Sequence, residues 1–378
     1  MKVLIVDSYY PRFLQAALPE VTRGDPDYES MLRRLLRLRF GTSDFYSRHL
    51  RELGIEAADV IFNCEPLQQR WAKEHGGRVP RRGWLPGLLG RLGRRPAAPP
   101  LGLLEIATAQ IRHHRPDVLY LQDLNLFPPG VLRGLKDEGV VRLVVGQIAC
   151  PLPPKEYLED LDLIVSSFPH YVRRFREEGK ASAYLRIAFD PVVLEEAGDH
   201  ERDLPCTFVG GLSPAHGART AFLERLAREV DMSFYGYGAE TLAPGSPIAP
   251  RHRGEAWALD MYRVLLRSRI TVNVHIDVAE NYANNMRLYE ATGCAALLVT
   301  DMKDNLAELF EPDREVLTYE SADEAVEKIR YCLDHPAEAE SIAAAGQART
   351  LREHTYGQRM AELAEILAAH LTGKGRGG

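Results

Sequence analysis

The sequence predicts an α/β protein of two domains, each a parallel β-sheet with helices on both faces. Short apolar runs alternate with amphipathic stretches, and this alternation occurs twice along the chain. Strands buried on both faces form unbroken apolar runs, and helices connect them when the strands are parallel. With 378 residues, the chain is also longer than one hydrophobic core normally holds.

The first alternation covers residues 1–185 and predicts a Rossmann-like N-terminal domain. Apolar runs predict its strands at 2–10, 56–63, 117–123, 141–149 and 161–168. Amphipathic spacing predicts helices at 43–54, 65–76 and 107–116. The first of these helices opens on Ser43 and Asp44, residue types that cap helix starts, and it stops at Gly54.

The second alternation covers residues 205–355 and predicts a second Rossmann-like domain, after a polar linker at 186–204. Its strands are expected at 206–212, 232–238, 270–276, 294–301 and 315–320. Its helices are expected at 219–230, 258–269, 284–293, 305–310 and 322–335. A terminal helix at 356–372 is expected to pack back on the N-terminal domain. Open α/β sheets bind ligands at the carboxyl ends of their strands, so we expect ligand loops of both domains to face a cleft.

Charge and cysteine content exclude several classes of protein. The formal net charge is 47 − 53 = −6, which argues against general nucleic-acid binding. The five cysteines are scattered and odd in number, so we expect neither disulfides nor a metal site, and a cytoplasmic location. The first apolar run ends at Asp7 and indicates a buried strand, not a signal peptide. No apolar run reaches the roughly 18 residues of a membrane span.

A basic insert, His75 to Pro100, interrupts the first domain. It holds six arginines and no acidic residue, so the rest of the chain carries −6 − 6 = −12. It also holds five large apolar residues, which are Trp84, Leu85, Leu88, Leu89 and Leu92. One interpretation is a mobile Gly/Pro-rich loop; the other is a cationic, apolar lid on the acceptor side or a peripheral membrane contact.

Glycine-containing turns follow the strands of the second domain. Gly210 and Gly211 come after a strand and before a helix, where a phosphate can approach backbone N–H groups that no Cβ covers. His216 and Arg219 follow and can add positive charge, and Gly236 lies in the next such turn. Tight turns explain each glycine equally well, because neither a Walker loop nor a complete GxGxxG motif is present.

The stretch NNMRLYEATG places a polar group of residues at a predicted helix start. Asn284 and Asn285 open it, and Arg287 suits a diphosphate because its planar fork donates two parallel hydrogen bonds. The helix N-terminus adds partial positive charge. Glu290, one turn on, can accept hydrogen bonds from ribose hydroxyls. The alternative is a surface Arg287–Glu290 pair, worth about 0.2–0.5 kcal/mol.

Candidates for acid–base chemistry are few. Asp7, Asp44 and Asp123 lie near strand ends or helix starts of the first domain, and a carboxylate there can serve as the base that deprotonates an acceptor hydroxyl. Asp44 also fits a simple helix-start residue. His275 ends a strand of the second domain. One interpretation is that it contacts a bound substrate there; the other is that it is a core histidine. Asp160 and Asp162 form a DLD sequence that reads as a solvated turn, so no metal-binding motif is expected.

Several segments resemble CgeB-type (spore-maturation-like) glycosyltransferases. The resemblance lies in 287–336 and 342–360, and, less specifically, in 40–63 and 67–76. It covers most of the chain but not the basic insert. It implies the GT-B fold and the transfer of a sugar from a nucleotide-diphosphate donor, with no bound metal and no cofactor.

The chain departs from this pattern in two places. Related retaining GT-B transferases carry Glu-x7-Glu; the second glutamate matches Glu290, but the first falls on Tyr282. They also carry an arginine and a lysine after the first strand of the second domain, where this chain has Gly211 and His216. The resemblance therefore implies donor binding but leaves retention or inversion open.

Two other functions fit the same pattern. A nucleotide-sugar epimerase would need catalytic acids on both sides of the cleft and no acceptor pocket, whereas the large basic insert favours a second substrate. A catalytically silent binding partner is the other alternative. Arg287 and Glu290 argue against it, while Tyr282 and Gly211 leave it open. The leading hypothesis is a metal-independent glycosyltransferase whose acceptor is anionic or amphipathic.

Overall fold

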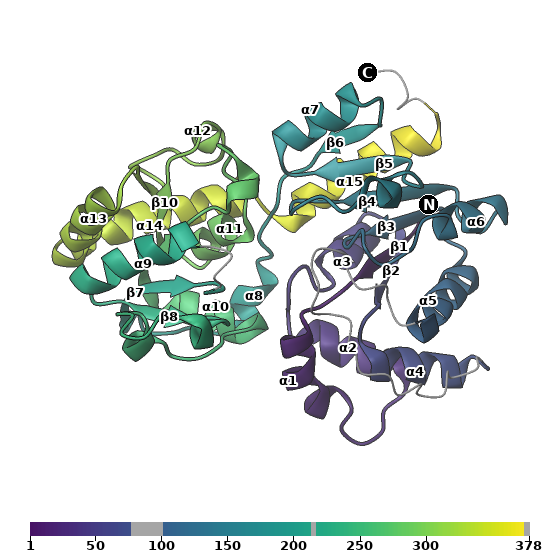
Figure 1. The fold of residues 1–378 in the computed structure, drawn as a ribbon, viewed down its shortest axis with the longest axis horizontal. Coiled ribbons are helices and arrows are strands. Elements are labelled where there is room, and N and C mark those ends of the chain that lie inside the picture. The colour runs from purple at the N-terminus through teal and green to yellow at the C-terminus, as the bar shows by residue number, and fades with distance from the viewer. Residues whose placement is uncertain (77–100, 213–216, 374–378) are drawn as a thin grey trace. The chain divides into compact units, whose positions relative to one another are not determined.

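The computed structural model describes residues 1–76, 101–212 and 217–373 and divides into two compact units (Figure 1). Unit 1 consists of Met1–Leu185 and the chain from Met360 onward, and unit 2 consists of Arg186–Arg359. Residues 77–100 of the basic insert and residue His216 lie outside the described residues. Each unit contains its own parallel sheet, as the sequence predicts.

Unit 1 contains six parallel strands in the order β2-β1-β3-β4-β5-β6. They are β1 (Lys2–Asp7), β2 (Glu56–Ile61), β3 (Val118–Leu121), β4 (Leu143–Gln147), β5 (Leu163–Ser166) and β6 (Ser182–Tyr184). Strands β3 and β5 are buried along their whole length, which explains their continuous apolar runs. The chain runs from β1 to β2 on one side of β1 and then crosses to β3 on the other side. The strand order therefore changes direction between β1 and β3.

Helices surround the first sheet (Figure 1). They are α1 (Pro11–Val21), α2 (Tyr28–Arg37), α3 (Phe45–Glu52), α4 (Glu65–Glu74), α5 (Leu101–His114), α6 (Val131–Asp137) and α7 (Pro169–Glu177). Helices α1, α2, α6 and α7 were not predicted. Pro19 lies inside α1 and obscures its pattern. The side chain of Asp27 caps α2 by accepting a 2.7 Å hydrogen bond from the Ser30 amide.

Unit 2 contains five parallel strands in the order β11-β10-β9-β7-β8. They are β7 (Leu204–Val209), β8 (Ser233–Tyr235), β9 (Ser268–Asn273), β10 (Leu297–Asp301) and β11 (Leu317–Tyr319). The helices are α8 (Val192–Ala197), α9 (Gly217–Glu229), α10 (Ala258–Arg267), α11 (Met286–Gly293), α12 (Leu306–Leu309), α13 (Ala322–Asp334) and α14 (Pro336–Glu353), and α15 (Tyr356–Leu371) begins at the end of this unit. The order changes direction between β7 and β9.

The segment 186–204, expected to be a linker, follows the last residue of the first part of unit 1. It contains α8 and belongs to unit 2. Its Phe189 ring packs on Gly293, where a Cβ atom would lie 2.5 Å from the ring. The segment is therefore part of a packed core. Helix α15 starts in unit 2, and its residues from Met360 onward group with unit 1.

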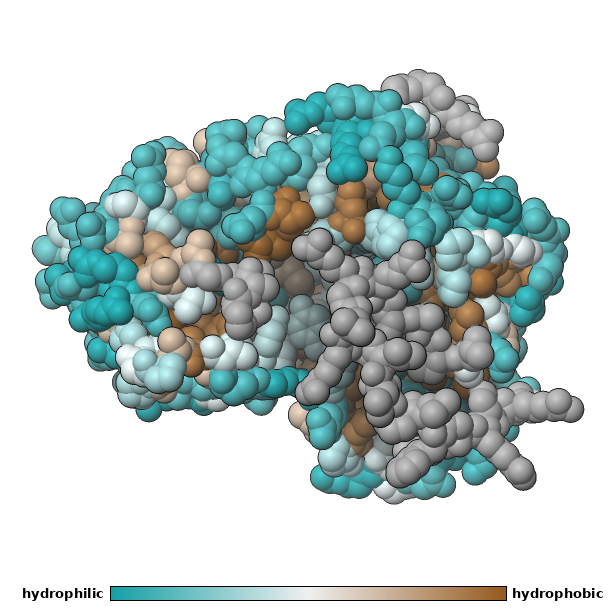
Figure 2. Space-filling model, viewed as in Figure 1, coloured by the Kyte–Doolittle hydropathy of each residue, from teal (hydrophilic) through white to brown (hydrophobic). Residues whose placement is uncertain are grey.

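The visible surface of both units is mostly hydrophilic, with smaller hydrophobic patches (Figure 2). In the part of the chain that the structure describes, no helix combines the length and apolarity that a membrane crossing requires.

The loops that follow β7 and β8 pack backbone against backbone. Gly236 has φ +141°, and a Cβ atom there would lie 2.1 Å from the carbonyl oxygen of Gly210. Gly238 has φ +92°, and its Cβ would lie 2.2 Å from the carbonyl oxygen of Leu212. A side chain at either position would separate the two loops.

Replacing Gly236 by alanine should therefore lower the free energy of unfolding by about 2–5 kcal/mol, from backbone strain plus the contact with Gly210. Gly245→Ala is the matched control, since Gly245 has φ +81° but nothing within 4 Å of its Cβ position. It should cost about 1–2 kcal/mol. Urea denaturation measures both; equal losses would show that the loops separate freely.

Candidate functional site

Helix α11 begins at a network of amides on the carboxyl edge of the unit 2 sheet. The Asn285 side chain caps the helix, accepting a 3.3 Å hydrogen bond from the Leu288 amide. Its Nδ2 donates to Oδ1 of Asn273, the last residue of β9, at 2.7 Å. Asn284 is buried beside it. The helix start is thereby held at the strand end, where its partial positive charge can meet an anion.

The predicted Arg287–Glu290 pair forms, but it is not a surface pair. Nη1 of Arg287 lies 3.0 Å from Oε2 of Glu290, and the two side chains are 14% and 6% exposed. Nε of Arg287 has no hydrogen-bond partner among the described residues. Burial raises the pKa of Glu290, an effect that the charge of Arg287 and the hydroxyl of Tyr262 partly offset. The helix thus holds a buried charge pair, and the Nε–H group of Arg287 can still donate a hydrogen bond.

His275 follows β9 and contacts the end of β10. Its Nδ1 lies 2.7 Å from Oδ1 of Asp301, which also accepts the His275 backbone N–H at 3.1 Å. Nζ of Lys303 lies 3.2 Å from Oδ2 of Asp301. Burial opposes ionisation of Asp301, but the hydrogen bond and charge of His275, with the charge of Lys303, hold its pKa below the usual range. Asp301 was not among the predicted residues, although its position after an apolar strand marks it.

Arg219 lies in the first turn of α9 and points back to the loop after β7. Its Nη2 donates to the carbonyl oxygen of Gly211 at 2.5 Å, and its guanidinium lies 5.9 Å from the centre of the Phe208 ring. Burial lowers the pKa of Arg219. Beside it is a cavity of about 20 Å³, lined by Ala218, Arg219, His275, Ile276 and Asp277.

The glycines at the predicted phosphate turns have packing roles. The Gly210 amide donates to the Tyr235 carbonyl at 2.9 Å, and the Gly236 amide donates to the Gly254 carbonyl at 3.0 Å. A Cβ atom on Gly211 would lie 2.6 Å from the Tyr237 ring. The N–H groups of Gly210 and Gly236 are therefore occupied in this structure, and phosphate binding at these turns stays a prediction.

Two carboxylates lie where the strand order of unit 1 changes direction. Asp7 ends β1, and Asp123 follows β3; the Ser8 hydroxyl donates to Oδ2 of Asp123 at 2.6 Å. Burial, together with the charge of Asp123, raises the pKa of Asp7 to about 7, against the hydrogen bonds from the Ser8 amide and Thr42. A carboxylate with that pKa is suited to accept a proton near neutral pH.

Asp44 precedes α3, as predicted, but its side chain makes no capping hydrogen bond. Its Oδ1 instead pairs with Nη1 of Arg39, a buried residue. The ion pair with the buried guanidinium occupies this carboxylate. The structure therefore favours Asp123 and Asp7 over Asp44 as candidates for a base.

No group of three or more residues among those described has the arrangement of a metal site. The DLD sequence is not the solvated turn that was expected. The Asp160 side chain is 4% exposed and binds Arg133 at 2.8 Å, while Oδ2 of Asp162 accepts the Val144 amide at 2.8 Å. Both carboxylates hold the backbone of unit 1 together.

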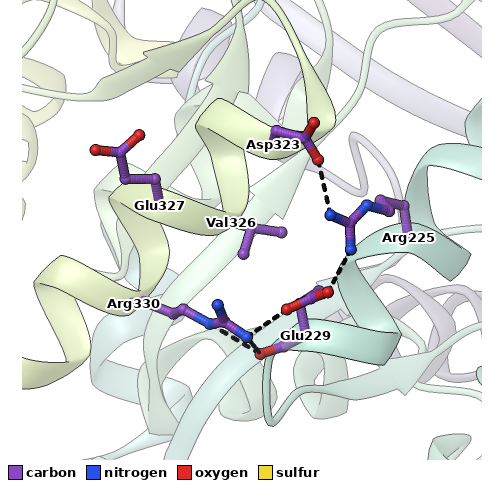
Figure 3. Close-up of a pocket in the computed structure, with 6 residues that line it drawn as sticks. All are labelled: Arg225, Glu229, Asp323, Val326, Glu327 and Arg330. Atoms are coloured by element: carbon purple, nitrogen blue, oxygen red, sulfur yellow. Dashed lines mark hydrogen bonds and ion pairs between the residues drawn. The ribbon is translucent and has the colours of Figure 1, made fainter.

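A larger hollow of about 330 Å³ lies between α9 and α13 (Figure 3). Its lining residues are Arg225, Glu229, Asp323, Val326, Glu327 and Arg330. Both arginines pair with carboxylates, Arg225 with Asp323 at 2.9 Å and Arg330 with Glu229 at 2.5 Å. The hollow lies toward the end of α9, whereas Arg219 is in its first turn. It is an exposed ion-pair network and not part of the candidate site.

Solved structures show which fold this is. Anabaena Alr3699/HepE in complex with UDP-glucose superimposes with a TM-score of 0.59 at 13% identity, covering 98% of this chain and 100% of that one. Sucrose-phosphate synthase from Thermosynechococcus elongatus gives 0.59 at 11% identity, covering 99% and 100%. A glycosyltransferase from Rickettsia africae gives 0.58 at 10%, covering 98% and 99%. With two parallel sheets, the chain has the predicted GT-B fold.

The sequence itself gives a narrower match. Residues 219–365 match the family model described as glycosyl transferase-like. This stretch contains Arg219, His275, Arg287 and Glu290. No curated protein matches the chain.

The burial of the Arg287–Glu290 pair can be tested by substitution. Arg287→Met should lower the free energy of unfolding by about 3–5 kcal/mol at neutral pH, because it leaves the Glu290 charge buried and unpaired. The loss should shrink near pH 5, since a group with a raised pKa in the folded state takes up a proton as the pH falls. The double variant Arg287→Met/Glu290→Leu should recover most of it.

Arg263→Met is the control for this series. Arg263 pairs with Asp260 at the same i,i+3 spacing, but the two side chains are 42% and 75% exposed. Its loss should stay below about 0.5 kcal/mol. Equal effects of the two single variants in urea denaturation would contradict a buried Arg287–Glu290 pair.

Proposed function

We propose that this chain is a glycosyltransferase that moves a sugar from a nucleotide-diphosphate donor to an acceptor hydroxyl. The observation that carries this proposal is the buried Arg287–Glu290 pair on α11, which lies in the stretch that matches the glycosyl transferase-like model. The UDP-glucose complex of the Anabaena protein, which shares the fold, supports a nucleotide-sugar donor. We further place the chain with the CgeB-type enzymes and in the cytoplasm, as its residues resemble that family and all five cysteines are free.

Unit 2 is the proposed donor side. Arg287 can donate from Nε to a diphosphate oxygen while Nη1 stays with Glu290, and the α11 N-terminus favours the same anion. Glu290 is assigned to the ribose hydroxyls, where hydrogen bonds to its carboxylate would offset its burial. Arg219 adds charge from the first turn of α9. In this proposal protein cations replace a metal ion, so transfer needs no cofactor.

Unit 1 is the proposed acceptor side. Asp7 and Asp123 lie together at the change of strand order, the position where open α/β sheets bind ligands. We assign Asp7 as the base that takes the acceptor proton, and Asp123 as the neighbour that raises its pKa. The arginines and apolar residues of the 75–100 insert suit an anionic or amphipathic acceptor or a membrane surface.

An epimerase on the same fold, or a silent binding partner, remains the alternative. A carboxylate with a pKa of about 7 in unit 1 favours chemistry over silent binding. An epimerase would act on the donor without an acceptor. Product analysis therefore separates the three functions, since only transfer joins the sugar to a second molecule.

Calorimetric titration with UDP-, GDP-, TDP- and ADP-sugars should identify one donor that binds, with EDTA present or absent. Glu290→Gln should weaken that binding by about 1–3 kcal/mol, the range for losing a hydrogen bond to a charged group. Glu327→Gln, an exposed change on α13, should not alter it. Absence of binding by every donor would overturn the proposed function, and loss of binding in EDTA would overturn metal independence.

Transfer to acceptor should depend on the unit 1 carboxylates. With a radiolabelled donor and polar and lipid extracts as acceptor sources, Asp7→Asn should lower transfer by about 10²- to 10⁴-fold, the range for a general base, without changing donor affinity. The wild-type rate should rise as the pH passes about 7, where Asp7 loses its proton.

Asp123→Asn removes the neighbouring charge, so it should move this rise to lower pH. Asp137→Asn, an exposed change at the end of α6, is the control and should leave the profile in place. Full transfer by Asp7→Asn would show that the proton goes elsewhere.

A further inference from the structure

The change of strand order in unit 2 brings together two segments that are distant in sequence. The first turn of α9 follows β7, and the His275 loop follows β9, the strand that pairs with β7. Between them is the cavity of about 20 Å³. A space of that size holds one oxygen atom, about the volume that a buried water requires.

One side chain that lines this cavity has an unsatisfied atom. The His275 side chain is 1% exposed, and its Nε2 is buried without a hydrogen-bond partner among the residues described. Asp301 accepts from Nδ1 at 2.7 Å, so the second proton of the ring belongs on Nε2 when the imidazole is charged. A buried polar atom without a partner is costly, and it requires an explanation such as a bound water, ion or ligand.

Charged groups from several elements face the ring. Asp301 contacts it from β10, and Asp277 follows it on its own loop. The two cations nearby are engaged elsewhere: Arg219 donates to the Gly211 carbonyl at 2.5 Å, and Lys303 lies 3.2 Å from Asp301 and donates to the Glu280 carbonyl at 3.2 Å. The Tyr319 hydroxyl on β11 donates to the Asn273 carbonyl.

We propose that His275, oriented by Asp301, is a binding residue that donates from Nε2 to a phosphate oxygen of the donor's diphosphate. The inference rests on the proposed function and adds a group to it. Helix α9 directs its N-terminus to the same cavity, and its 13 residues supply partial positive charge there. The imidazolium and the helix end together balance the diphosphate without a metal ion.

Two substitutions separate the ring nitrogens. In His275→Asn the amide nitrogen occupies the place of Nδ1 and can keep the hydrogen bond to Asp301, but nothing replaces Nε2. In His275→Gln the amide nitrogen reaches the place of Nε2. His335→Asn, at an exposed position after α13, is the control for the change of residue type.

The probes are UDP, GDP, TDP and ADP, with the matching nucleosides. For the diphosphate that binds, His275→Asn should weaken affinity about ten- to hundredfold, the loss for one hydrogen bond to a charged group. His275→Gln should recover part of it, and nucleoside affinity should stay the same in both variants. Calorimetry in buffers of different ionisation enthalpy near pH 8 should show proton uptake on binding by wild type, absent in both variants.

The outcomes distinguish this inference from the proposed function. If no nucleoside diphosphate binds wild type, the proposed function and the inference both fail. If a diphosphate binds wild type and His275→Asn equally, with equal proton uptake, only the inference fails. Loss of nucleoside affinity in His275→Asn would also overturn it, because the ring would then contact a hydroxyl or the base instead of a phosphate.

Discussion

Asn273, the last residue of β9, holds four elements of unit 2 at one edge of the sheet. Its Oδ1 accepts from Asn285 at 2.7 Å, its Nδ2 donates to the Thr300 hydroxyl at 2.9 Å, and its carbonyl accepts from the Tyr319 hydroxyl at 2.8 Å. These bonds join β9 to the start of α11 and to β10 and β11. Through the cap of α11, this residue helps to fix the position of Arg287, two residues after the cap.

Each unit contains a carboxylate whose burial disfavours its charged form. Burial raises the pKa of Glu290 and of Asp7, so each charge lowers the stability of the folded chain at neutral pH. An apolar residue at either position would avoid that cost. Groups with such shifted pKa values concentrate at functional sites, where they bind a ligand or exchange a proton with the substrate.

The two sheets use the same geometry for different chemistry. In each sheet the strand order changes direction beside its first strand, and the carboxyl ends of two strands leave room there for side chains. Unit 1 places Asp7 and Asp123 at that position, whereas unit 2 places Arg219 and His275. Acidic groups suit an acceptor hydroxyl that must lose a proton, and cationic groups suit a diphosphate.

The sequence by itself determined the two parallel sheets, most of their strands and helix α11, because these features depend on local periodicity. Strands buried on both faces must be apolar, and a cap residue lies next to the helix that it caps. Local pattern did not reveal α1, which contains Pro19, and the polar composition of 186–204 did not show the packing of Phe189 on Gly293.

Only the tertiary structure decided which side chains meet and how deeply they are buried. His275 and Asp301 are 26 residues apart and come together because β9 pairs with β10. Sequence spacing predicted that Arg287 can reach Glu290, but not that the pair is removed from water, because burial depends on Tyr262 and other residues from distant segments. The chemistry of a charged group follows from its surroundings, and these exist only in the folded chain.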